Sequence, residues 1–434
     1  MPVPSLAFDL TRLITRLRHA SPSGIDRVDL AYARHVLGQD GERFGLVSTA
    51  LGPRVLPRAE AVAIVEAVAA GWVEDRDATQ DPVYRRLAAA LGSEPEPGAP
   101  LAGPDRGRVG DRRRVQARTM ATTLRARGPE ILPQGTIYLH TSHLRLDKPG
   151  RFDWLYDRRD IRPVFFVHDL IPIDYPEYGR PGEAERHRIR MTTIAHHAAH
   201  VLVNSGDVGA RFLAFCAANG LPARPVSVAL LGVEPVFRPP GEGPAFTPHK
   251  PTFVVCGTIE PRKNHLALLN LWRDLASRHG SATPRLVLVG RRGWEAENVI
   301  DMLERCPAMR AHVSEVSGLS SHGLAALLRS ATALLMPSFA EGYGLPVIEA
   351  AASGLPVVAS DLAVHREIGA TFAHFLDPLD GPGWRRAVED LAEPGSALRR
   401  ALVERLTGHE VPSWTNHFVT VDMALQRARC AADA

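Results

Sequence analysis

Short apolar runs alternate with amphipathic stretches along the second half of the sequence. The runs have no polar face, which is typical of parallel strands that are buried on both sides. The stretches between them carry apolar residues at helical spacing, and this alternation predicts a doubly wound parallel α/β sheet. The expected strands are 252–257, 285–290, 312–316, 333–337, 356–360 and 374–377, and the expected helices include 266–277, 322–329 and 384–391.

The first half of the chain alternates in the same way, although less regularly. Between residues 71 and 133 the alternation stops, and Pro- and Gly-rich stretches at 93–100 and 102–108 are typical of loops. The arginine-rich stretch 111–127 is expected to be helical, and residues 238–248 are expected to link two domains. The expected strands are 6–10, 44–49, 136–140, 164–168, 200–204 and 226–230, with helices at 25–37, 183–197 and 414–427.

The composition excludes several classes of protein. The 434 residues suffice for two or three domains, and the hydrophobic (45%) and charged (23%) fractions are those of a globular protein. A net charge of +3 does not indicate a nucleic-acid partner. The four cysteines form no C-x-x-C pair, which argues against a zinc site or a disulfide framework. Because neither a membrane-spanning stretch nor a signal peptide is recognisable, a cytoplasmic location is expected.

Residues 338–349 hold two glutamates on either side of a glycine turn, between the expected strand 333–337 and an expected helix at 347–353. Open α/β sheets bind ligands at the carboxyl ends of their strands, and the amides of a helix N-terminus suit a phosphate. Eight helical residues span at most about 12 Å, so the glutamates can reach different ends of a nucleotide sugar. Glu349 is expected to bind the ribose and Glu341 to lie near the sugar. The simpler interpretation is a turn with two solvated glutamates.

The whole segment E-G-Y-G-L-P-V-I-E, followed by A-x-x-S-G-L-P-V-V-A-S-D, resembles the E-x7-E signature of retaining glycosyltransferases of family 4. The resemblance implies an α/β protein with the GT-B fold, in which two Rossmann-like doubly wound domains face each other across a cleft. It implies an acceptor-binding domain at 1–240 with an irregular insertion at 71–133. It further implies a nucleotide-sugar-binding domain at 250–410 and a final helix within 411–434 that crosses back to the N-terminal domain.

A second segment, C-G-T-I-E-P-R-K-N-H, follows the expected strand 252–257. Asn264 is expected to cap the next helix, which leaves Arg262 and Lys263 in the loop at the strand ends. Two fixed cations there suit a diphosphate leaving group, whose negative charge grows as the glycosidic bond breaks; a solvated Arg-Lys pair is the alternative. The segment resembles the family's G-T-x-E-P-R-K-N, in which the Arg and Lys bind the donor diphosphate. The donor-binding residues expected beside them are Gly257, Thr258, Gly342, Tyr343, Gly344 and Leu345.

A third segment, H-D-L-I-P-I-D-Y-P-E, begins at His168 where the expected strand 164–168 ends. A histidine in this position is commonly a packed or hydrogen-bonded residue. The segment nevertheless resembles an N-domain loop of the family whose histidine faces the donor sugar, and this implies a catalytic-site role for His168. Asp169 is expected to orient that histidine or to cap a turn.

The segment G-I-D-R at 24–27 resembles the glycine loop of the family, which lies over the diphosphate. The resemblance implies that Gly24 and Arg27 bind the donor. Asp26 stands where the family has a second glycine, and this departure counts against a close approach of the backbone to the ligand. An N-cap role for Ser23 is the alternative interpretation.

Three further positions follow expected strands. Gly318 stands where family members contact the base through the backbone. Ser205 is expected to cap a helix, although its surroundings resemble a family segment. Trp294, in the loop 290–294, either helps to shape the donor pocket or simply packs at the start of a helix.

Several rival signatures are missing. There is neither a G-x-x-x-x-G-K-[ST] loop nor a G-x-G-x-x-G, which argues against an NAD-dependent enzyme. The only D-x-D, at 75–77, does not follow a strand as it does in metal-dependent GT-A enzymes, so neither a metal nor a cofactor is expected. The arginines of 106–127 fit a solvated face or a loop. Contact with an anionic polysaccharide, or peripheral contact with an anionic lipid at the inner face of the membrane, is the alternative.

The resemblance therefore implies a retaining hexosyltransferase that moves a sugar from a nucleotide sugar to a hydroxyl of a glycan or lipid-linked acceptor. The E-P-R-K-N and H-D-L-I-P variants are most similar to those of bacterial mannosyl- and rhamnosyltransferases of surface polysaccharides. GDP-mannose is accordingly the first donor to expect, and a UDP- or dTDP-sugar remains open. A GT-B module that binds a nucleotide sugar or a protein without catalysis is the alternative from a different class.

Overall fold

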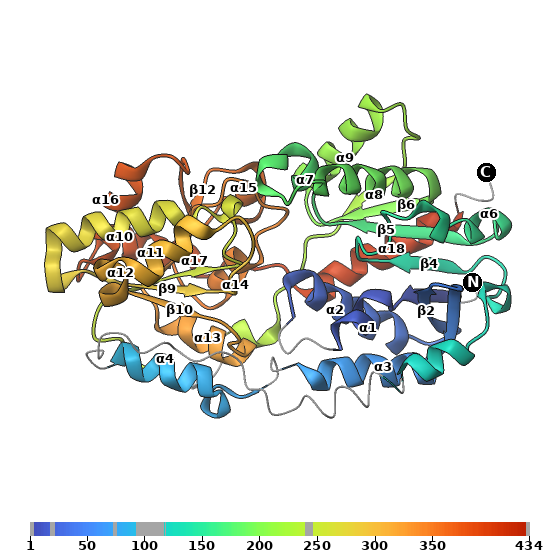
Figure 1. Ribbon diagram of the computed structural model, residues 1–434, viewed down its shortest axis with the longest axis horizontal. Helices are drawn as coiled ribbons and strands as arrows, with labels where there is room; N and C mark the ends of the chain where they lie inside the picture. Colours follow the sequence, from blue (N-terminus) through green and yellow to red (C-terminus); the bar gives the residue numbers. More distant parts are fainter. Residues whose placement is uncertain are drawn as a thin grey trace. The chain divides into compact units, whose positions relative to one another are not determined.

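A computed structural model describes residues 4–17, 22–72, 76–92, 117, 119–238 and 246–430 (Figure 1). The chain divides into two compact units, and neither is continuous in sequence. Unit 1 comprises Met1–Trp72, Asp105–Leu231 and Trp414–Ala434, and unit 2 comprises Val73–Pro104 and Gly232–Ser413.

Unit 1 is built on a seven-stranded sheet with the order β3-β2-β1-β4-β5-β6-β7. All neighbouring strands are parallel except β2 and β3, which form an antiparallel hairpin. β3 was not expected from the sequence because it contains Gly52, Pro53 and Pro57; proline is tolerated there because β3 is an edge strand. The strands are β1 Leu6–Asp9, β2 Arg43–Thr49, β3 Gly52–Pro57, β4 Ile137–His140, β5 Arg162–Val167, β6 His200–Val203 and β7 Val226–Val228.

Helices connect and cover these strands. The last of them, α18, packs against β4, β5, β6 and β7, so the end of the chain returns to unit 1. His417 holds α18 in place, because its Nδ1–H donates to the carbonyl of Leu230 (3.0 Å) while its Nε2 accepts from the hydroxyl of Tyr32 (2.8 Å). The helices are α1 Thr11–Arg16, α2 Gly24–Gly38, α3 Arg58–Gly71, α6 Trp154–Asp157, α7 Ile171–Asp174, α8 Glu183–His197, α9 Gly206–Ala218 and α18 Trp414–Cys430, with short 3-10 turns η2 Pro129–Ile131, η3 Pro149–Arg151 and η4 Pro176–Tyr178.

Unit 2 is built on a six-stranded sheet with the order β10-β9-β8-β11-β12-β13, and every pair of neighbours is parallel. Its central strands are fully buried, as their apolar sequences predict. The expectation of a doubly wound parallel sheet is confirmed. The strands are β8 Thr252–Cys256, β9 Arg285–Val289, β10 Val313–Val316, β11 Ala333–Met336, β12 Val357–Ser360 and β13 His374–Leu376.

The helices of unit 2 cover both faces of this sheet, with α10 and α13 on opposite sides (Figure 1). Trp272 of α10 is fully buried against Phe253 of β8 and donates from its indole N–H to the carbonyl of Pro284 (2.9 Å). The helices are α4 Pro82–Gly92, α10 His265–His279, α11 Glu297–Arg305, α12 Pro307–His312, α13 Ser321–Ser330, α14 Leu345–Ala352, α15 Ala363–Gly369, α16 Gly381–Ala392 and α17 Ala397–Leu406, with 3-10 turns η1 Ala78–Gln80, η5 Pro235–Phe237, η6 Pro261–Lys263 and η7 Gly280–Ala282.

Helix α4 departs from the expected organisation, because the segment was expected to be part of an insertion in the N-terminal domain and instead packs within unit 2. One carboxylate oxygen of Asp81 accepts from the backbone N–H of Ser320 (2.7 Å) and the other from that of Val83 (2.8 Å). Tyr84 is buried with Ala326 of α13. The physical reason is the apolar stripe of α4, which needs a partner surface and finds one on α13.

The remainder of the expected insertion is described in part. Residues 119–125 are helical, in agreement with the helix expected from the arginine-rich stretch, and residues 93–116 and 118 lie outside the described residues. Arg127, at the end of the stretch, pairs with the edge strand β3, because its carbonyl accepts from the N–H of Val55 (2.8 Å). In the part of the chain that the structure describes, no helix is both long and apolar enough to cross a bilayer.

Candidate functional site

Two loops meet at the carboxyl edge of the sheet in unit 2, because β8 and β11 are parallel neighbours. Glu341, in the loop after β11, accepts from both cations in the loop after β8. Its Oε2 lies 2.8 Å from Nη1 of Arg262, and its Oε1 lies 2.5 Å from Nζ of Lys263 and 2.7 Å from the hydroxyl of Ser338. The structure therefore brings together three of the residues predicted for the donor site.

Asn264 and the backbone hold the two loops against each other. Asn264 precedes α10, but its side chain does not cap the helix as predicted, because the residue adopts a left-handed conformation (φ 55°). Its amide instead donates to the carbonyls of Pro337 (3.1 Å) and Pro378 (3.2 Å). The N–H of Phe339 donates to the carbonyl of Arg262 (2.7 Å). These bonds fix the position of Arg262 relative to the strand ends.

Gly257 makes room for the lysine. A Cβ on Gly257 would lie 2.9 Å from Cε of Lys263, and the φ of 139° at this position is one that side chains rarely tolerate. The lysine stem therefore crosses directly over the backbone of Gly257 to reach Glu341. This contact gives a packing reason for the glycine that the motif C-G-T-I-E-P-R-K-N predicts.

A second carboxylate completes the cluster. Nε of Arg262 lies 2.7 Å from Oε1 of Glu260, whose side chain is buried. The side chains of Lys263 and Glu341 are only 8% and 6% exposed. Burial by itself would raise the pKa of Glu341, but the charges of Lys263 and Arg262 outweigh it and hold that pKa well below its usual range. Glu341 is therefore ionised throughout the physiological pH range.

Helix α14 begins directly after this cluster. Gly344 adopts a φ of 104° before the first residue of the helix, Leu345, and Pro346 lies in the first turn, as predicted. Glu349 lies in the same helix and is buried. The two glutamates of E-x7-E thus stand on a turn and on a helix respectively. Binding of the ribose by Glu349 stays a prediction.

Two buried histidines flank the Glu341 cluster and were not predicted from the sequence. His265 is the first residue of α10, and neither of its ring nitrogens has a partner among the described residues. His365 of α15 is fully buried; its Nδ1–H donates to the carbonyl of Ser360 (2.9 Å), and its Nε2 has no partner among the described residues. Burial lowers the pKa of both, that of His265 to about 4. For His265 the available signal was its position directly after E-P-R-K-N, whereas His365 lies outside any motif.

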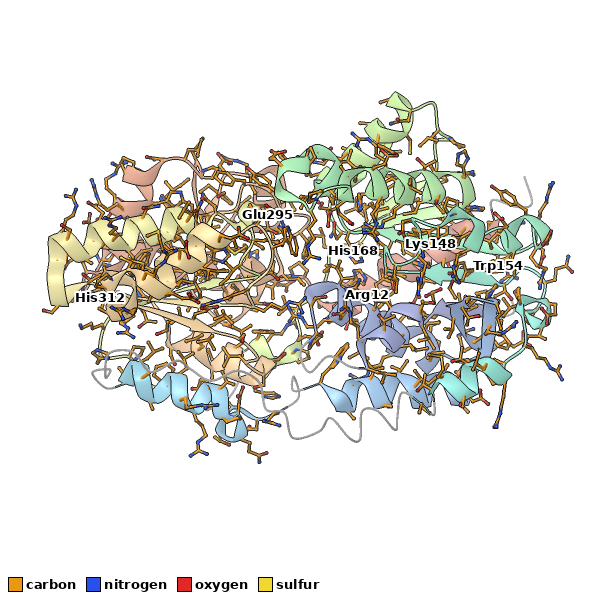
Figure 2. All side chains as sticks on the ribbon, in the orientation of Figure 1. Arg12, Lys148, Trp154, His168, Glu295 and His312 are labelled. Carbon is orange, nitrogen blue, oxygen red and sulfur yellow. The ribbon has the colours of Figure 1, made fainter. Side chains whose placement is uncertain are left out.

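In unit 1, His168 lies directly after β5 and is buried (Figure 2). Its Nε2 donates to the carbonyl of Thr141 (2.6 Å), its backbone N–H donates to Nε2 of His143 (3.3 Å), and its carbonyl accepts from the amide of Asn204 (3.0 Å). Burial lowers the pKa of His168 to about 4, so the ring is neutral. Because a carbonyl only accepts, the hydrogen is on Nε2 and Nδ1 carries the lone pair. Contact of His168 with a sugar stays a prediction.

His143 and His187 support the strand end and were not predicted. The ring centre of His143 lies 5.3 Å from that of His168 and 5.0 Å from that of His187. His187 donates from Nε2 to the carbonyl of Asp169 (3.0 Å). The carboxylate of Asp169 accepts from the N–H of Ile171 (3.2 Å), so this residue caps a turn, which was one of its two expected roles.

The start of α2 shows why the sequence departs from the glycine loop at Asp26. Ser23 and Asp26 form a reciprocal capping box, and Asp26 also accepts from Nε of Arg12 (2.6 Å) and of Arg16 (3.0 Å). The N-cap interpretation of Ser23 is confirmed, and Asp26 serves the helix and the two arginines. Gly24 is the first residue of α2, and donor binding by Gly24 and Arg27 stays a prediction.

Among the other predicted positions, Ser205 caps α9 by accepting from the N–H of Val208, as expected. Gly318 follows β10 at the carboxyl edge of the sheet in unit 2. Of the D-x-D at 75–77, the described Asp77 is exposed and accepts from the N–H of Thr79 (2.8 Å), which fits a solvated cap. Among the described residues, no group of three or more His, Cys, Asp or Glu is arranged to hold a metal ion.

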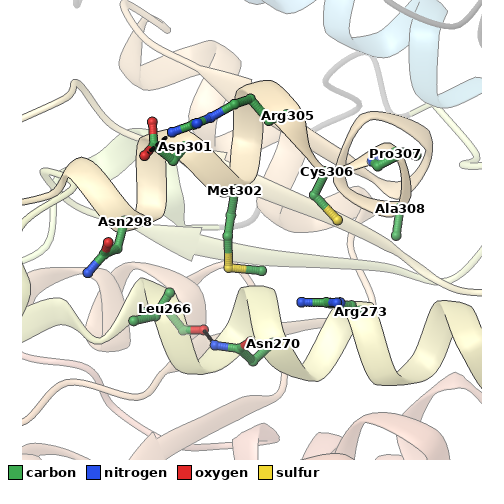
Figure 3. A pocket seen from close by; sticks show the side chains of 10 residues that line it. All are labelled: Leu266, Asn270, Arg273, Asn298, Asp301, Met302, Arg305, Cys306, Pro307 and Ala308. Carbon is green, nitrogen blue, oxygen red and sulfur yellow. Dashed lines mark hydrogen bonds and ion pairs between the residues drawn. The ribbon is translucent and has the colours of Figure 1, made fainter.

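Each unit also has an open pocket that contains none of the predicted site residues. In unit 2 a groove of about 800 Å³ lies among α10, α11 and α12, and Figure 3 shows Met302 and Leu266 on its apolar side. In unit 1 a pocket of about 530 Å³ lies between the β2–β3 hairpin and the segment that carries Lys148 and Trp154.

Residues 250–393 match the family model described as "Glycosyl transferases group 1". The chain is 30% identical to the serotype-specific mannosyltransferase WbdA of Escherichia coli over 243 residues, which are 52% of this chain and 29% of the relative. It is 32% identical to the O-antigen chain mannosyltransferase B of Escherichia coli over 142 residues, 30% of this chain and 37% of the relative. The chain thus spans less than a third of the length of the WbdA proteins that it matches.

Solved structures match along the whole chain. Sucrose-phosphate synthase from Thermosynechococcus elongatus superimposes with a TM-score of 0.61 at 16% identity, and Anabaena HepE, solved in complex with UDP, with a TM-score of 0.56 at 12% identity. In both cases the match covers 100% of each chain. At these identities the likeness establishes the fold. The chain belongs to the group 1 glycosyltransferases of family 4, has the GT-B fold, and is a homologue of the bacterial O-antigen mannosyltransferases.

Proposed function

We propose that this chain is a retaining, metal-independent hexosyltransferase that moves a sugar from a nucleotide diphosphate to a hydroxyl of a glycan or lipid-linked acceptor. The observation that carries the proposal is the buried cluster of Arg262, Lys263 and Glu341 at the carboxyl ends of β8 and β11. Cations that are fixed in a buried site stabilise a leaving group as it gains charge, at little cost in reorganisation. The cluster lies where open α/β sheets bind their ligands.

Each predicted residue then has a role. Arg262, Lys263 and the backbone amides of Gly344 and Leu345 stabilise the departing diphosphate. Glu349 binds the ribose, and Glu341 lies near the transferred sugar. His168 contacts that sugar, as the family resemblance implies.

A dedicated general base is not required by this scheme. In the front-face course usually described for the family, the acceptor hydroxyl attacks the anomeric carbon on the side that the diphosphate leaves. The departing phosphate oxygen accepts the hydroxyl proton. The ionised state of Glu341 fits this scheme, since an acid with so low a pKa is a poor proton donor or acceptor near neutral pH.

We propose GDP-mannose as the donor. The support is that the relatives WbdA, O-antigen chain mannosyltransferase B and RfbU of Salmonella typhimurium are all named as mannosyltransferases. A UDP-sugar is the competing donor, because the structural neighbour HepE was solved with UDP. A thermal-shift screen with GDP-mannose, UDP-glucose and dTDP-rhamnose identifies the donor that the chain binds. A ligand that binds the native state raises the melting temperature of the protein.

Donor hydrolysis in the absence of acceptor tests catalysis itself. The purified chain should release nucleoside diphosphate from the donor that it binds, and Glu341→Ala should release it much more slowly. Binding without release in the unaltered chain would indicate a nucleotide-sugar-binding module without catalytic activity. Release that is unaffected by Glu341→Ala would exclude the proposed site.

A further inference from the structure

The cluster around Glu341 is electrically balanced before any donor binds. Glu260 pairs with Nε of Arg262 (2.7 Å), and Glu341 pairs with Nη1 of Arg262 (2.8 Å) and with Nζ of Lys263 (2.5 Å). Two positive charges thus face two negative charges. Three of the four side chains are less than a tenth exposed, so water screens the cluster poorly.

A nucleotide sugar would disturb this balance. Its diphosphate carries two negative charges, and uncompensated charge in a buried site is costly. The site must therefore gain positive charge or lose negative charge when the donor binds. The carboxylate of Glu341 is held in its charged form by two cations and a hydroxyl. The groups that remain able to take up a proton are Glu260, whose pKa burial raises, and the neighbouring histidines.

His365 has the geometry for this role. Its Nδ1–H is already used in the bond to the carbonyl of Ser360, so Nε2 carries the lone pair and, buried, has no partner among the described residues. A Cβ on Gly344 would lie 3.4 Å from this Nε2, so the nitrogen lies beside the residue that directly precedes α14. The amides of that turn are the proposed diphosphate contacts. A second N–H at Nε2 would thus be placed at the same turn.

The charges around the two histidines favour His365 over His265. Burial keeps both neutral before the donor binds. At His365 the charge of Glu341 and the bond to the carbonyl of Ser360 favour protonation, and the charge of Lys263 opposes it. At His265 both Lys263 and Arg262 oppose protonation, and only Glu341 favours it.

We infer that His365 is a further donor-binding residue, whose Nε2 takes up a proton from solvent when the diphosphate binds and then donates a hydrogen bond toward it. One N–H bond forms at Nε2, and the buffer loses one proton. The inference rests on the proposed function, since it requires a diphosphate at the start of α14. It adds a residue outside the motifs that point to the donor site.

Calorimetric titration of GDP-mannose into the full chain near pH 7 measures the proton directly. A nucleotide sugar suits this purpose because its diphosphate does not titrate near neutral pH, whereas a terminal phosphate has a pKa of about 6. In buffers of different ionisation enthalpy, the apparent binding enthalpy should vary with a slope of about one proton taken up. UDP-glucose replaces GDP-mannose if it gives the larger thermal shift.

Substitutions of single histidines then identify the group that takes up the proton. His365→Asn should abolish the uptake and weaken binding by about tenfold or more, as expected for loss of a charge-assisted hydrogen bond. The matched control is His312→Asn at the end of α12, a histidine of the same unit whose charged neighbours are Lys250 and Arg285. His312→Asn should keep both the uptake and the affinity.

Each other outcome overturns the inference. Binding without proton uptake by the unaltered chain would do so even if His365→Asn failed to fold, and it would leave the proposed function intact. Uptake that persists in His365→Asn, or that disappears in His265→Asn instead, would assign the proton elsewhere. If no nucleotide sugar bound at all, the proposed function and the inference would fall together.

Discussion

Oε1 of Glu341 lies 2.5 Å from Nζ of Lys263, and both side chains are almost fully buried. We propose that Glu341 lies near the transferred sugar, and its carboxylate also contacts the cations proposed for the diphosphate. In this proposal Glu341 links the two parts of the donor site.

Lys263→Met should strongly destabilise unit 2, because it leaves Glu341 buried without its nearest cation. Loss of one partner of a buried ion pair costs on the order of 3–5 kcal/mol. Urea unfolding, with hydrogen exchange at β8 and β11 as the local readout, measures the change. The double variant Lys263→Met, Glu341→Gln should recover part of the loss.

The control for this measurement is an exposed pair in the same unit. Nε of Arg278 lies 2.8 Å from the carboxylate of Asp274, and these side chains are 50% and 40% exposed. Arg278→Met should cost less than about 1 kcal/mol. Equal losses for Arg278→Met and Lys263→Met would show that burial adds nothing to the Lys263–Glu341 pair.

Arg262→Ala should lower kcat per folded molecule, because the charge of Arg262 matters most as the leaving group develops charge. The substitution also leaves the buried Glu260 and Glu341 with one cation fewer, so the folded fraction is measured alongside. Removal of one such stabilising donor costs on the order of 100-fold or more. Steady-state kinetics checks this, with Arg292→Ala as the control, since Arg292 pairs with Glu304 and Glu315 on the surface. Near-normal turnover of the double variant Arg262→Ala, Lys263→Ala would rule out the leaving-group role.

Glu349→Ala and Glu341→Gln should affect nucleotide binding differently. Glu349→Ala should raise KM and weaken binding of the free nucleoside diphosphate, because it removes a contact with the ribose. Glu341→Gln should lower kcat while keeping or increasing that affinity, because it removes a competitor for Arg262 and Lys263. Calorimetry measures the affinity of both variants for nucleoside diphosphate. If both substitutions weakened this affinity equally, Glu349 would not bind the ribose while Glu341 contacts the sugar.

Turnover should survive EDTA, because the proposed positive charge at the leaving group comes from Arg262 and Lys263. The assay compares initial rates after chelation with rates after addition of Mg²⁺ or Mn²⁺. Loss of activity with EDTA and recovery with either ion would contradict the proposed stabilisation of the diphosphate.

Acidification should destabilise unit 1 through His417. Burial lowers the pKa of His417 to about 4, below its ordinary value of 6.5. Between these values the unfolded chain binds a proton that the folded chain does not, so stability falls as pH falls from about 6.5 to about 4, by up to about 1.4 kcal/mol per pH unit. His417→Gln should make the fall in the urea midpoint between pH 7 and pH 5 shallower. The same substitution at the exposed His322 should leave it unchanged.

The strands were predictable wherever the chain is apolar without interruption. Every strand except β3 was expected to within two residues, and in the central strands burial on both faces imposes the apolar run. β3 was not predicted because Pro53 and Pro57 are compatible with a strand only at a sheet edge. The packing of α4 on α13 was not predicted because the contacting residues Asp81 and Ser320 are 239 residues apart in sequence.

The candidate site was predictable as a set of loops but not as a set of contacts. The motif spacing indicated that Arg262, Lys263 and Glu341 follow strands, and parallel pairing of β8 with β11 brings them to one edge. The ion pairs themselves join residues 78 and 79 positions apart, and local pattern carries no information about them. His365 lies outside any motif, and only its burial and its unpartnered nitrogen identify it.

The discontinuity of both units has a consequence for synthesis on the ribosome. Helix α4 leaves the ribosome long before Ser320, the residue that bonds to Asp81, and at about 5–20 residues per second the delay is on the order of tens of seconds. Strands β4 to β7 wait likewise, because α18, which packs on them, follows all the strands of unit 2 in sequence. During elongation the apolar faces of α4 and of strands β4 to β7 are therefore without their native cover. The nascent chain must depend on other means, such as chaperones, to keep those faces from aggregating.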